Sequence, residues 1–152
     1  MLNRKRLFAE QLAAPAAKRR NVSLVVEHQG VDLVAYGSLS GVDHPGRAFL
    51  AETLAVRYMG LKHRSASQQL TTLAGPAVTM KARLLGAIFR VGYPMSAAMP
   101  GVLPRTRFTL ADDRLRLHLP HDLAFLSGEH LESRLEQLAD VAGIKRSEIV
   151  SD

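Results

Sequence analysis

Basic side chains at helical spacing are the residues of this sequence best suited to chemistry on phosphates. Arg83 and Arg90 are seven residues apart, which places them on nearly the same helix face, and Gly86 between them leaves room for a ligand. A guanidinium group binds phosphate oxygens in pairs. These residues therefore suggest a site for a phosphate polyanion, with pairing to acids of the same chain as the other interpretation. The candidate residues of the site are Arg47, Arg57, Lys62, Arg83, Arg90 and Arg105.

The charge is unevenly distributed along the 152 residues, which carry a net charge of +6. Residues 44–111 hold nine Lys and Arg residues and a single acid, Glu52, whereas residues 112–152 hold five bases and nine acids. Glu52 is better explained as a salt-bridge partner of one Arg than as a catalytic acid. The other cations either face a polyanion or borrow acids from the flanks, and both interpretations remain open. The acids available in the C-terminal third are Glu129, Glu132, Glu136 and Asp140.

The sequence offers little support for a catalytic site. It has no Cys, no Walker-type loop, no dinucleotide fingerprint, no His-Glu-x-x-His and no Gly-x-Ser-x-Gly. One alternative is a stand-alone metal-dependent phosphohydrolase of the HD type that uses His and Asp from residues 28–44. Against it, the His-Asp dipeptide at 121–122 follows a strand and a Pro, and Asp43 is placed to cap a helix. We predict neither a metal nor a cofactor in this chain.

A second alternative is a basic nucleic-acid-binding module led by residues 1–27, which form a basic arm or helix ahead of a domain at 28–152. Its base-stacking capacity is small, because the chain has no Trp and only three Tyr and five Phe. There is no apolar run of about 18 residues that could cross a membrane. No apolar stretch follows the N-terminal basic residues, as a secretory signal would require. We therefore expect a cytoplasmic protein.

The apolar periodicity predicts a mainly α domain, with a small antiparallel hairpin near the C-terminus. Residues 28–40 are interpreted as a short helix, although their valines also fit an extended chain. Asp43 and Pro45 mark the start of a second helix, which should end near Gly60. A further short helix is expected at 66–74, where a Gly-Pro pair ends it.

The segment at 77–93 is the most apolar of the chain. Apolar side chains surround most of its circumference, so this helix should lie in the middle of the domain, and Pro94 should kink it. Basic and apolar residues then alternate at about 105–119, which predicts a half-buried hairpin with one basic face. The final helix is predicted at about 129–142, closed by Gly143.

Two segments carry a resemblance to a known family. They read DHPGRAFLA at 43–51 and ARLLGAIFRVGYPMSAAMPGVLPR at 82–105, and the second is long and specific. A hairpin with a Leu-rich second strand, the segment LAFLSG and a final helix follow in the same order. Together they resemble the C-terminal region of the exopolyphosphatase and guanosine pentaphosphate phosphohydrolase family, in its alphaproteobacterial form. The resemblance extends over about residues 28–143.

The resemblance implies an HD-like helical domain that usually lacks a working metal centre. In the family, this domain helps to form a basic channel for polyphosphate and contributes to dimer contacts. Two actin- or hexokinase-like domains hold the catalytic machinery, and they have no counterpart here, so we expect this chain to be inactive alone. The implied partners are polyphosphate or a phosphorylated nucleotide, a catalytic partner domain, and a second copy in a homodimer.

Overall fold

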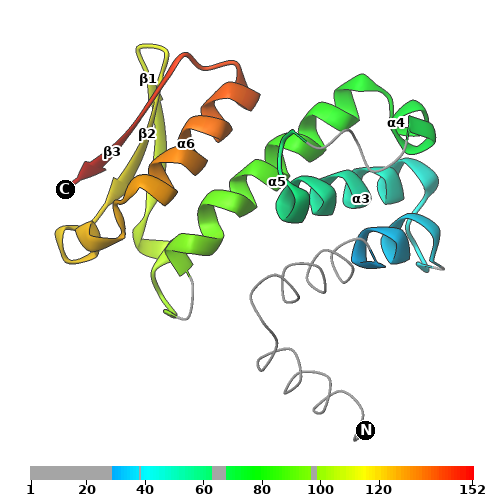
Figure 1. Ribbon diagram of the computed structural model, residues 1–152, viewed down its shortest axis with the longest axis horizontal. Helices are drawn as coiled ribbons and strands as arrows, with labels where there is room; N and C mark the ends of the chain where they lie inside the picture. The colour runs from blue at the N-terminus through cyan, green and yellow to red at the C-terminus, as the bar shows by residue number, and fades with distance from the viewer. Residues whose placement is uncertain (1–28, 38, 63–67, 97–98) are drawn as a thin grey trace, which may run out of the picture.

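Two groups of elements, joined by one long helix, make up the computed structural model (Figure 1). The structure describes residues 29–37, 39–62, 68–96 and 99–152, so the predicted arm at 1–27 lies outside the described residues. The mainly α fold with a small sheet near the C-terminus is confirmed. The helices are α3 (His44–Met59), α4 (Gln68–Ala74), α5 (Pro76–Ser96) and α6 (Glu129–Ala142); the strands are β1 (Arg107–Ala111), β2 (Arg114–Leu119) and β3 (Arg146–Ser151); 3-10 turns run over Leu103–Arg105 and His121–Leu126.

The start of α3 follows the capping signal in the sequence. The Asp43 carboxylate accepts a hydrogen bond from the backbone N–H of Gly46 at 2.8 Å, and Pro45 lies in the first turn. The helix ends at Met59, and Gly60 takes a φ of +93°, a conformation that L side chains rarely adopt. Residues 29–36 are also helical, which agrees with the helical interpretation of that segment.

Helix α5 lies in the middle of the fold, as predicted, and packs against α3, α4 and α6. It is longer than the sequence indicated and includes Pro94 within its helical range. Its apolar residues are not all buried, because Ile88 and Phe89 are 38% and 46% exposed. The apolar pattern therefore located the helix correctly, and part of that apolar surface faces away from the core.

Gly86 is the point at which α3 and α5 come closest. A Cβ atom added there would lie 2.7 Å from Val56 Cβ and 2.8 Å from the carbonyl oxygen of Thr53. The Thr53 hydroxyl, which is hydrogen-bonded to the Phe49 carbonyl within α3, also lies 3.3 Å from the Ala82 carbonyl oxygen of α5. The space beside Gly86 is thus filled by α3, which corrects the expectation that this glycine leaves room for a ligand.

The apolar interior has two parts, one in each group of elements. The first joins α3 to the helical segment 29–36 and to α4 through buried residues that include Val31, Ala51 and Leu70. The second joins the end of α5 to the sheet and α6, with Leu117 and Leu135 almost fully buried. Because α5 packs against α3 and α4 as well as against α6, it connects the helical group to the part of the fold that holds the sheet.

The predicted hairpin is present, but its first strand begins at Arg107, since Leu103–Arg105 forms a 3-10 turn. Asp112 and Asp113 have φ values of 53° and 58°, as a two-residue type I′ turn requires. Along β2 the leucines are buried, whereas the alternating Arg114, Arg116 and His118 are half-buried. The hairpin and its basic face are thus confirmed, and half-burial holds for β2, whereas the apolar Phe108 and Leu110 of β1 are exposed.

The third strand, β3, is missing from the sequence prediction. It runs parallel to β2 in a sheet of order β1-β2-β3, with Leu117 opposite Ile149. The final helix, by contrast, has the predicted bounds, and Gly143 ends it with a left-handed φ of 71°. None of the helices in the described ranges combines the length and apolar character that a membrane span requires.

Candidate functional site

Four of the six candidate cations gather around the C-terminal end of α3, and we call them the α3-end cluster: Arg57, Lys62, Arg83 and Arg90. Arg83 reaches from α5 to α3, where its Nη1 lies 2.9 Å from Glu52 Oε1. Its Nη2 donates to the carbonyl oxygen of Leu61 at 2.7 Å, just before Lys62. The Glu52 side chain is only 7% exposed, so this carboxylate is the salt-bridge partner that the sequence suggested.

Arg90 caps the end of α3 from the same face of α5. Its Nη1 donates to the carbonyl oxygens of Val56 and Arg57, both at 3.2 Å, and its guanidinium packs against Gly60. A cation at a helix C-terminus interacts favourably with the partial negative charge of the last carbonyls. Its Nε is buried and has no hydrogen-bond partner among the described residues. The seven-residue spacing of Arg83 and Arg90 thus directs both groups to the last turns of α3.

Arg57 is held by two aromatic rings. Its guanidinium carbon lies 4.3 Å from the ring centre of Tyr93 on α5 and 5.1 Å from that of Tyr58. Both rings remain exposed, at 61% and 48%. Stacking on aromatic faces restrains a guanidinium without neutralising its charge, so Arg57 presents a positioned cation. Lys62 is exposed and has no ion-pair partner in the described ranges.

The remaining two candidates lie elsewhere. Arg47, near the start of α3, donates to the carbonyl oxygens of Gly37 at 2.7 Å and Val42 at 3.3 Å, and so closes the loop before α3. Arg105, beside the sheet, pairs with Asp122 on the surface. This hydrogen bond holds the pKa of the Asp122 carboxyl below its usual range and raises that of Arg105. The six candidates therefore do not line one continuous groove.

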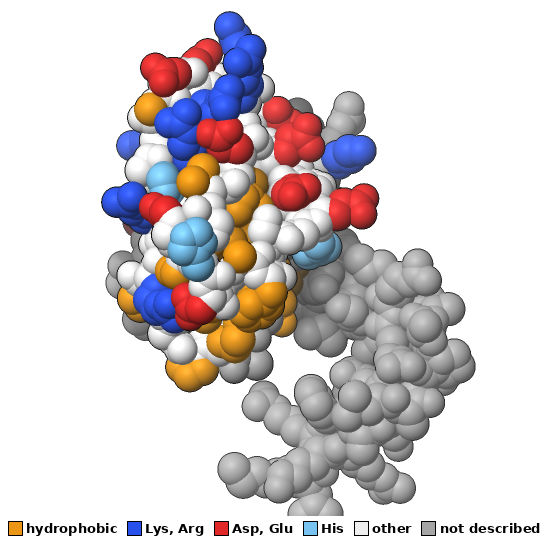
Figure 2. Space-filling view, turned by 90° about the vertical axis from the view of Figure 1, so that its left-hand side faces the viewer, with side chains coloured by type: hydrophobic (Ala, Val, Ile, Leu, Met, Phe, Trp, Pro, Cys, Tyr) orange, Lys and Arg blue, Asp and Glu red, His pale blue; other side chains and the backbone are white. Residues whose placement is uncertain are grey.

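The basic face of the hairpin is largely neutralised by acids from the end of the chain. Glu148 on β3 pairs with both Arg114 and Arg116, which lowers the pKa of this carboxyl, chiefly through its hydrogen bond to Arg116. Asp152 pairs with Arg107 at 3.3 Å. Figure 2 shows basic and acidic side chains intermixed on the face that it presents, above a band of hydrophobic side chains. The basic side chains of the hairpin therefore pair mostly with acids of the same chain.

A chain of polar contacts also crosses the outer face of the sheet. The Thr109 hydroxyl lies 2.8 Å from Nε2 of His118, and Nδ1 of His118 lies 3.1 Å from the Asp152 carboxylate. Because these three residues come from β1, β2 and the end of the chain, their contacts tie the last residues to the hairpin. The sequence did not point to this network, since its members are distant along the chain.

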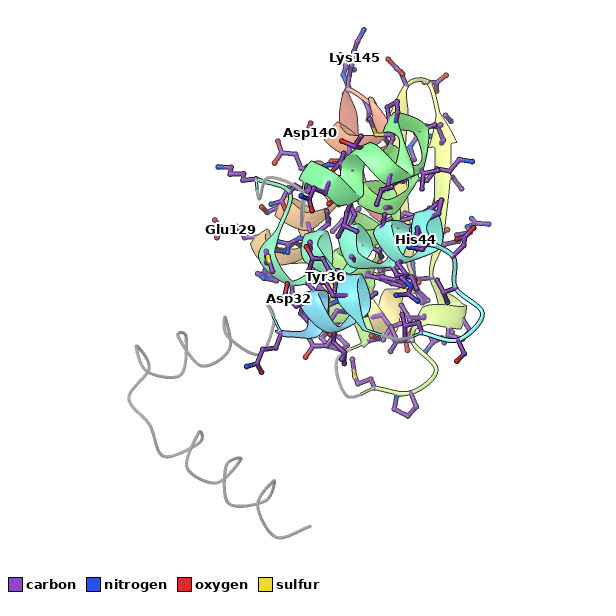
Figure 3. The ribbon with its side chains drawn as sticks, turned by 90° about the vertical axis from the view of Figure 1, so that its right-hand side faces the viewer. Asp32, Tyr36, His44, Glu129, Asp140 and Lys145 are labelled. Atoms are coloured by element: carbon purple, nitrogen blue, oxygen red, sulfur yellow. The ribbon has the colours of Figure 1, made fainter. Side chains whose placement is uncertain are left out.

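The acids of α6 do not neutralise the α3-end cluster. Glu129, Glu132, Glu136 and Asp140 line a groove of about 830 Å³ between α6 and β3. Figure 3 labels Glu129 and Asp140 on this side, together with Lys145. No ion pair between described residues joins one of these acids to a cation of residues 44–96. The interpretation in which α6 supplies the counter-charges is wrong for the described residues.

The residues proposed for a metal-dependent alternative do not converge. In the described part of the chain, no group of three His, Asp or Glu residues could hold a metal ion. The Asp43 carboxylate is occupied by its capping bond, and Asp32 and His44 lie on separate elements in Figure 3. His28 lies outside the described residues. The described residues therefore bring together no set of ligands for the HD-type hypothesis.

Comparison with known families decides what kind of domain carries this cluster. The family model described as "Exopolyphosphatase, C-terminal" matches residues 17–150. The chain belongs to the exopolyphosphatase C-terminal domain family. A search of curated proteins found no match. The resemblance seen in the sequence is thereby confirmed, and the match extends beyond its expected start at residue 28.

Within this exopolyphosphatase C-terminal domain, the match includes every residue of the α3-end cluster. Tyr58 and Tyr93, whose rings contact Arg57, are residues of this candidate site that sequence reasoning missed. Tyr58 follows Arg57 directly, but Tyr93 is 36 positions further along the chain and meets Arg57 only because α3 and α5 cross. Tyr93 lies within the specific segment at 82–105, which could have drawn attention to it. The sequence did not show, however, that Arg57 is its partner.

Proposed function

We propose that this exopolyphosphatase C-terminal domain is non-catalytic and binds the phosphates of polyphosphate, or of a similar polyanion, at the α3-end cluster. One observation carries the proposal: four cations meet at one helix end, and Glu52 is the only described carboxylate in an ion pair with them. The C-terminus of a helix contributes about half a negative charge. About two and a half positive charges therefore remain for an anionic ligand.

The members of the cluster differ in how they would act. Lys62 is exposed, and Arg57 is half-buried but is held by two exposed tyrosine rings rather than by a described carboxylate or carbonyl, so both would contact phosphate oxygens directly. Arg83 and Arg90 already donate to carbonyl groups, and they would act mainly through their charge. A linear phosphate chain suits this arrangement, because it requires positive charge but no base-specific contact.

Catalysis would come from a partner. The proposal assigns to this chain phosphate binding and contacts with a catalytic domain or a second copy, in the cytoplasm. Several large apolar side chains support such contacts because they are exposed: Leu33, Tyr36, Leu73, Met80, Leu110 and Phe125. Apolar surface of this kind marks interaction sites when it is contiguous.

The test is binding of a fluorescently labelled polyphosphate to the full chain over a salt series. Arg57→Gln and Lys62→Gln should each weaken binding and reduce the slope of log affinity against log salt by about 1. Lys145→Gln is the matched control, because Lys145 is 85% exposed at the other end of the fold. Equal affinities of all three variants would refute the site.

Two further measurements separate the alternatives. Duplex DNA that displaces polyphosphate completely at equal phosphate concentration would favour the nucleic-acid-binding hypothesis. Phosphate release from polyphosphate by the chain alone, with Mn²⁺ or Mg²⁺ present, would contradict the non-catalytic role. We expect weak competition by DNA and no release.

A further inference from the structure

Strand β1 is an edge of the sheet that no other element of the described residues covers. Among the described strands it pairs only with β2. Its Phe108 and Leu110 lie opposite Leu117 and Leu115, so they share the inner face of the sheet. Yet Phe108 is 39% and Leu110 is 63% exposed, whereas Leu117 is fully buried. The apolar inner face of the sheet thus extends onto β1, beyond the part that is buried by the helices.

The turn determines which backbone groups of β1 are free. A two-residue type I′ turn is closed by a hydrogen-bonded pair, here Ala111 and Arg114. Bonded and non-bonded pairs alternate along an antiparallel ladder, so Thr109 also bonds to β2. Phe108 and Leu110 therefore direct their N–H and C=O groups away from β2, toward the open edge.

Apart from Arg107 at its start, β1 carries no feature that protects this edge against pairing. Natural edge strands carry Lys, Pro, bulges or a covering element, and β1 has none of these between Phe108 and Ala111. The opposite edge differs, since on β3 Ile149 packs against the core and Glu148 is engaged with two Arg residues. In Figure 3 the hairpin lies along the upper right margin of the molecule.

We propose that β1 pairs antiparallel with β1 of a second copy, around a two-fold axis at Thr109, to form one six-stranded sheet. This register makes Phe108 and Leu110 of the two copies hydrogen-bonded partners, which uses all of their free backbone groups. Their side chains then form one apolar strip on the inner face. The inference specifies the homodimer contact of the proposed function, whereas phosphate binding does not depend on it.

Charge complementarity supports this register and a second copy as the occupant. Antiparallel pairing about Thr109 places the Asp112-Asp113 turn of one copy beside Arg105 and Arg107 of the other. Arg105 and Arg107 already pair with Asp122 and Asp152 within one copy, but their side chains are 49% and 67% exposed, so they can also face the acidic turn of the second copy. A register centred on Phe108 or Leu110 would leave part of the strand without a partner, so the Thr109 axis gives the fullest overlap.

Thr109→Cys tests the axis, because the chain has no other Cys. Non-bonded antiparallel pairs have Cα atoms about 4.5 Å apart, which is within disulfide range. Under mild oxidation, T109C should form a disulfide-linked dimer in high yield, and Val150→Cys on the other edge should not. Cross-linking of both variants alike, or of V150C only, would overturn the proposal.

Leu110→Pro tests the edge itself, because it removes an outward N–H without removing a bond to β2. Sedimentation equilibrium should show wild-type dimers of the 16.6 kDa chain. In L110P, dimerisation should weaken about 10- to 100-fold, since two symmetric hydrogen bonds are lost. Phe125→Lys, at another exposed apolar residue, is the control and should dimerise normally.

Leu110→Lys provides a second variant that keeps the backbone intact and should also be monomeric, with circular dichroism confirming that it is folded. A wild-type chain that stays monomeric at high concentration, or an L110K chain that dimerises normally, would refute the edge. Both variants should bind polyphosphate with wild-type affinity at the α3-end cluster. Failure of one proposal would therefore leave the other intact.

Discussion

Replacing Gly86 by Ala tests how closely α3 and α5 must approach. The added Cβ would lie 2.7 Å from Val56 Cβ and 2.8 Å from the Thr53 carbonyl oxygen, and neither atom is the end of a flexible side chain. The two helices would have to move apart. Overpacking of this kind costs about 1–3 kcal/mol. Ala in a helix interior recovers about 1 kcal/mol relative to Gly.

Since both contacts are with rigid atoms, we expect the cost to fall in the upper part of this range. The free energy of unfolding should then decrease by about 1–2 kcal/mol. For a chain of this size, each kcal/mol changes Tm by about 2–4 °C, so Tm should fall by about 2–8 °C. Thermal unfolding followed by circular dichroism, together with urea titration, measures both quantities.

Gly92→Ala is the matched control in the same helix. Its added Cβ would meet only Leu103 Cδ2, at 3.9 Å, which is an ordinary van der Waals contact. G92A should therefore gain about 0.5–1 kcal/mol from helix propensity alone. If G86A were as stable as G92A, Gly86 would not be a packing requirement, and the earlier reading of it as space for a ligand would regain support.

Two further substitutions examine ion pairs. Glu52→Gln should lower the free energy of unfolding by about 1–3 kcal/mol, because Arg83 loses its nearly buried counter-charge; the same variant should bind polyphosphate more tightly, and unchanged affinity would count against the cluster. Arg116 and Arg114 lower the pKa of Glu148, so its contribution to stability is full above the ordinary value of 4.5 and is lost as pH falls through the lower folded-state value. Thermal unfolding of Glu148→Gln between pH 7 and pH 3 should therefore show a shallower acid loss than wild type, and parallel curves would contradict this.

The helix boundaries could be predicted because local chemistry decides them. Asp43 supplies a hydrogen-bond acceptor to the first turn of α3, and the glycines at 60 and 143 adopt backbone conformations that other residues avoid. The hairpin could be predicted equally well, since the alternation of apolar and polar residues places every second side chain on one face. These signals act within a few residues, so the sequence displays them directly.

Strand β3 could not be predicted in the same way. Of its residues in RSEIVS, Ile149 is the one that packs against the core, which leaves no clear alternation to detect. Strand β3 pairs in parallel with β2, and α6 lies between the two strands along the chain. The strand therefore forms because β2 supplies hydrogen-bond partners and α6 packs against it. The contact of Arg57 with Tyr93 and the approach of α3 to Gly86 are likewise products of helix crossing.

The fate of the cations shows why a charge count alone did not define the site. Sequence reasoning offered two outcomes for the basic middle segment, a polyanion or internal acids. Arg47 and Arg90 show a third outcome, because they donate hydrogen bonds to backbone carbonyls. A carbonyl satisfies the hydrogen bonds of a guanidinium, but it carries no net charge to cancel the positive one.

This distinction bears on function, because ligand attraction depends on net charge, whereas rigidity depends on satisfied hydrogen bonds. A guanidinium held by carbonyls is fixed in position and still contributes to the potential over distances of about 8 Å at physiological salt. On the hairpin, by contrast, carboxylates cancel the charge of Arg114 and Arg116. In the described structure, the helical group is therefore the part that would attract a phosphate chain, although the hairpin carries a comparable density of Arg residues.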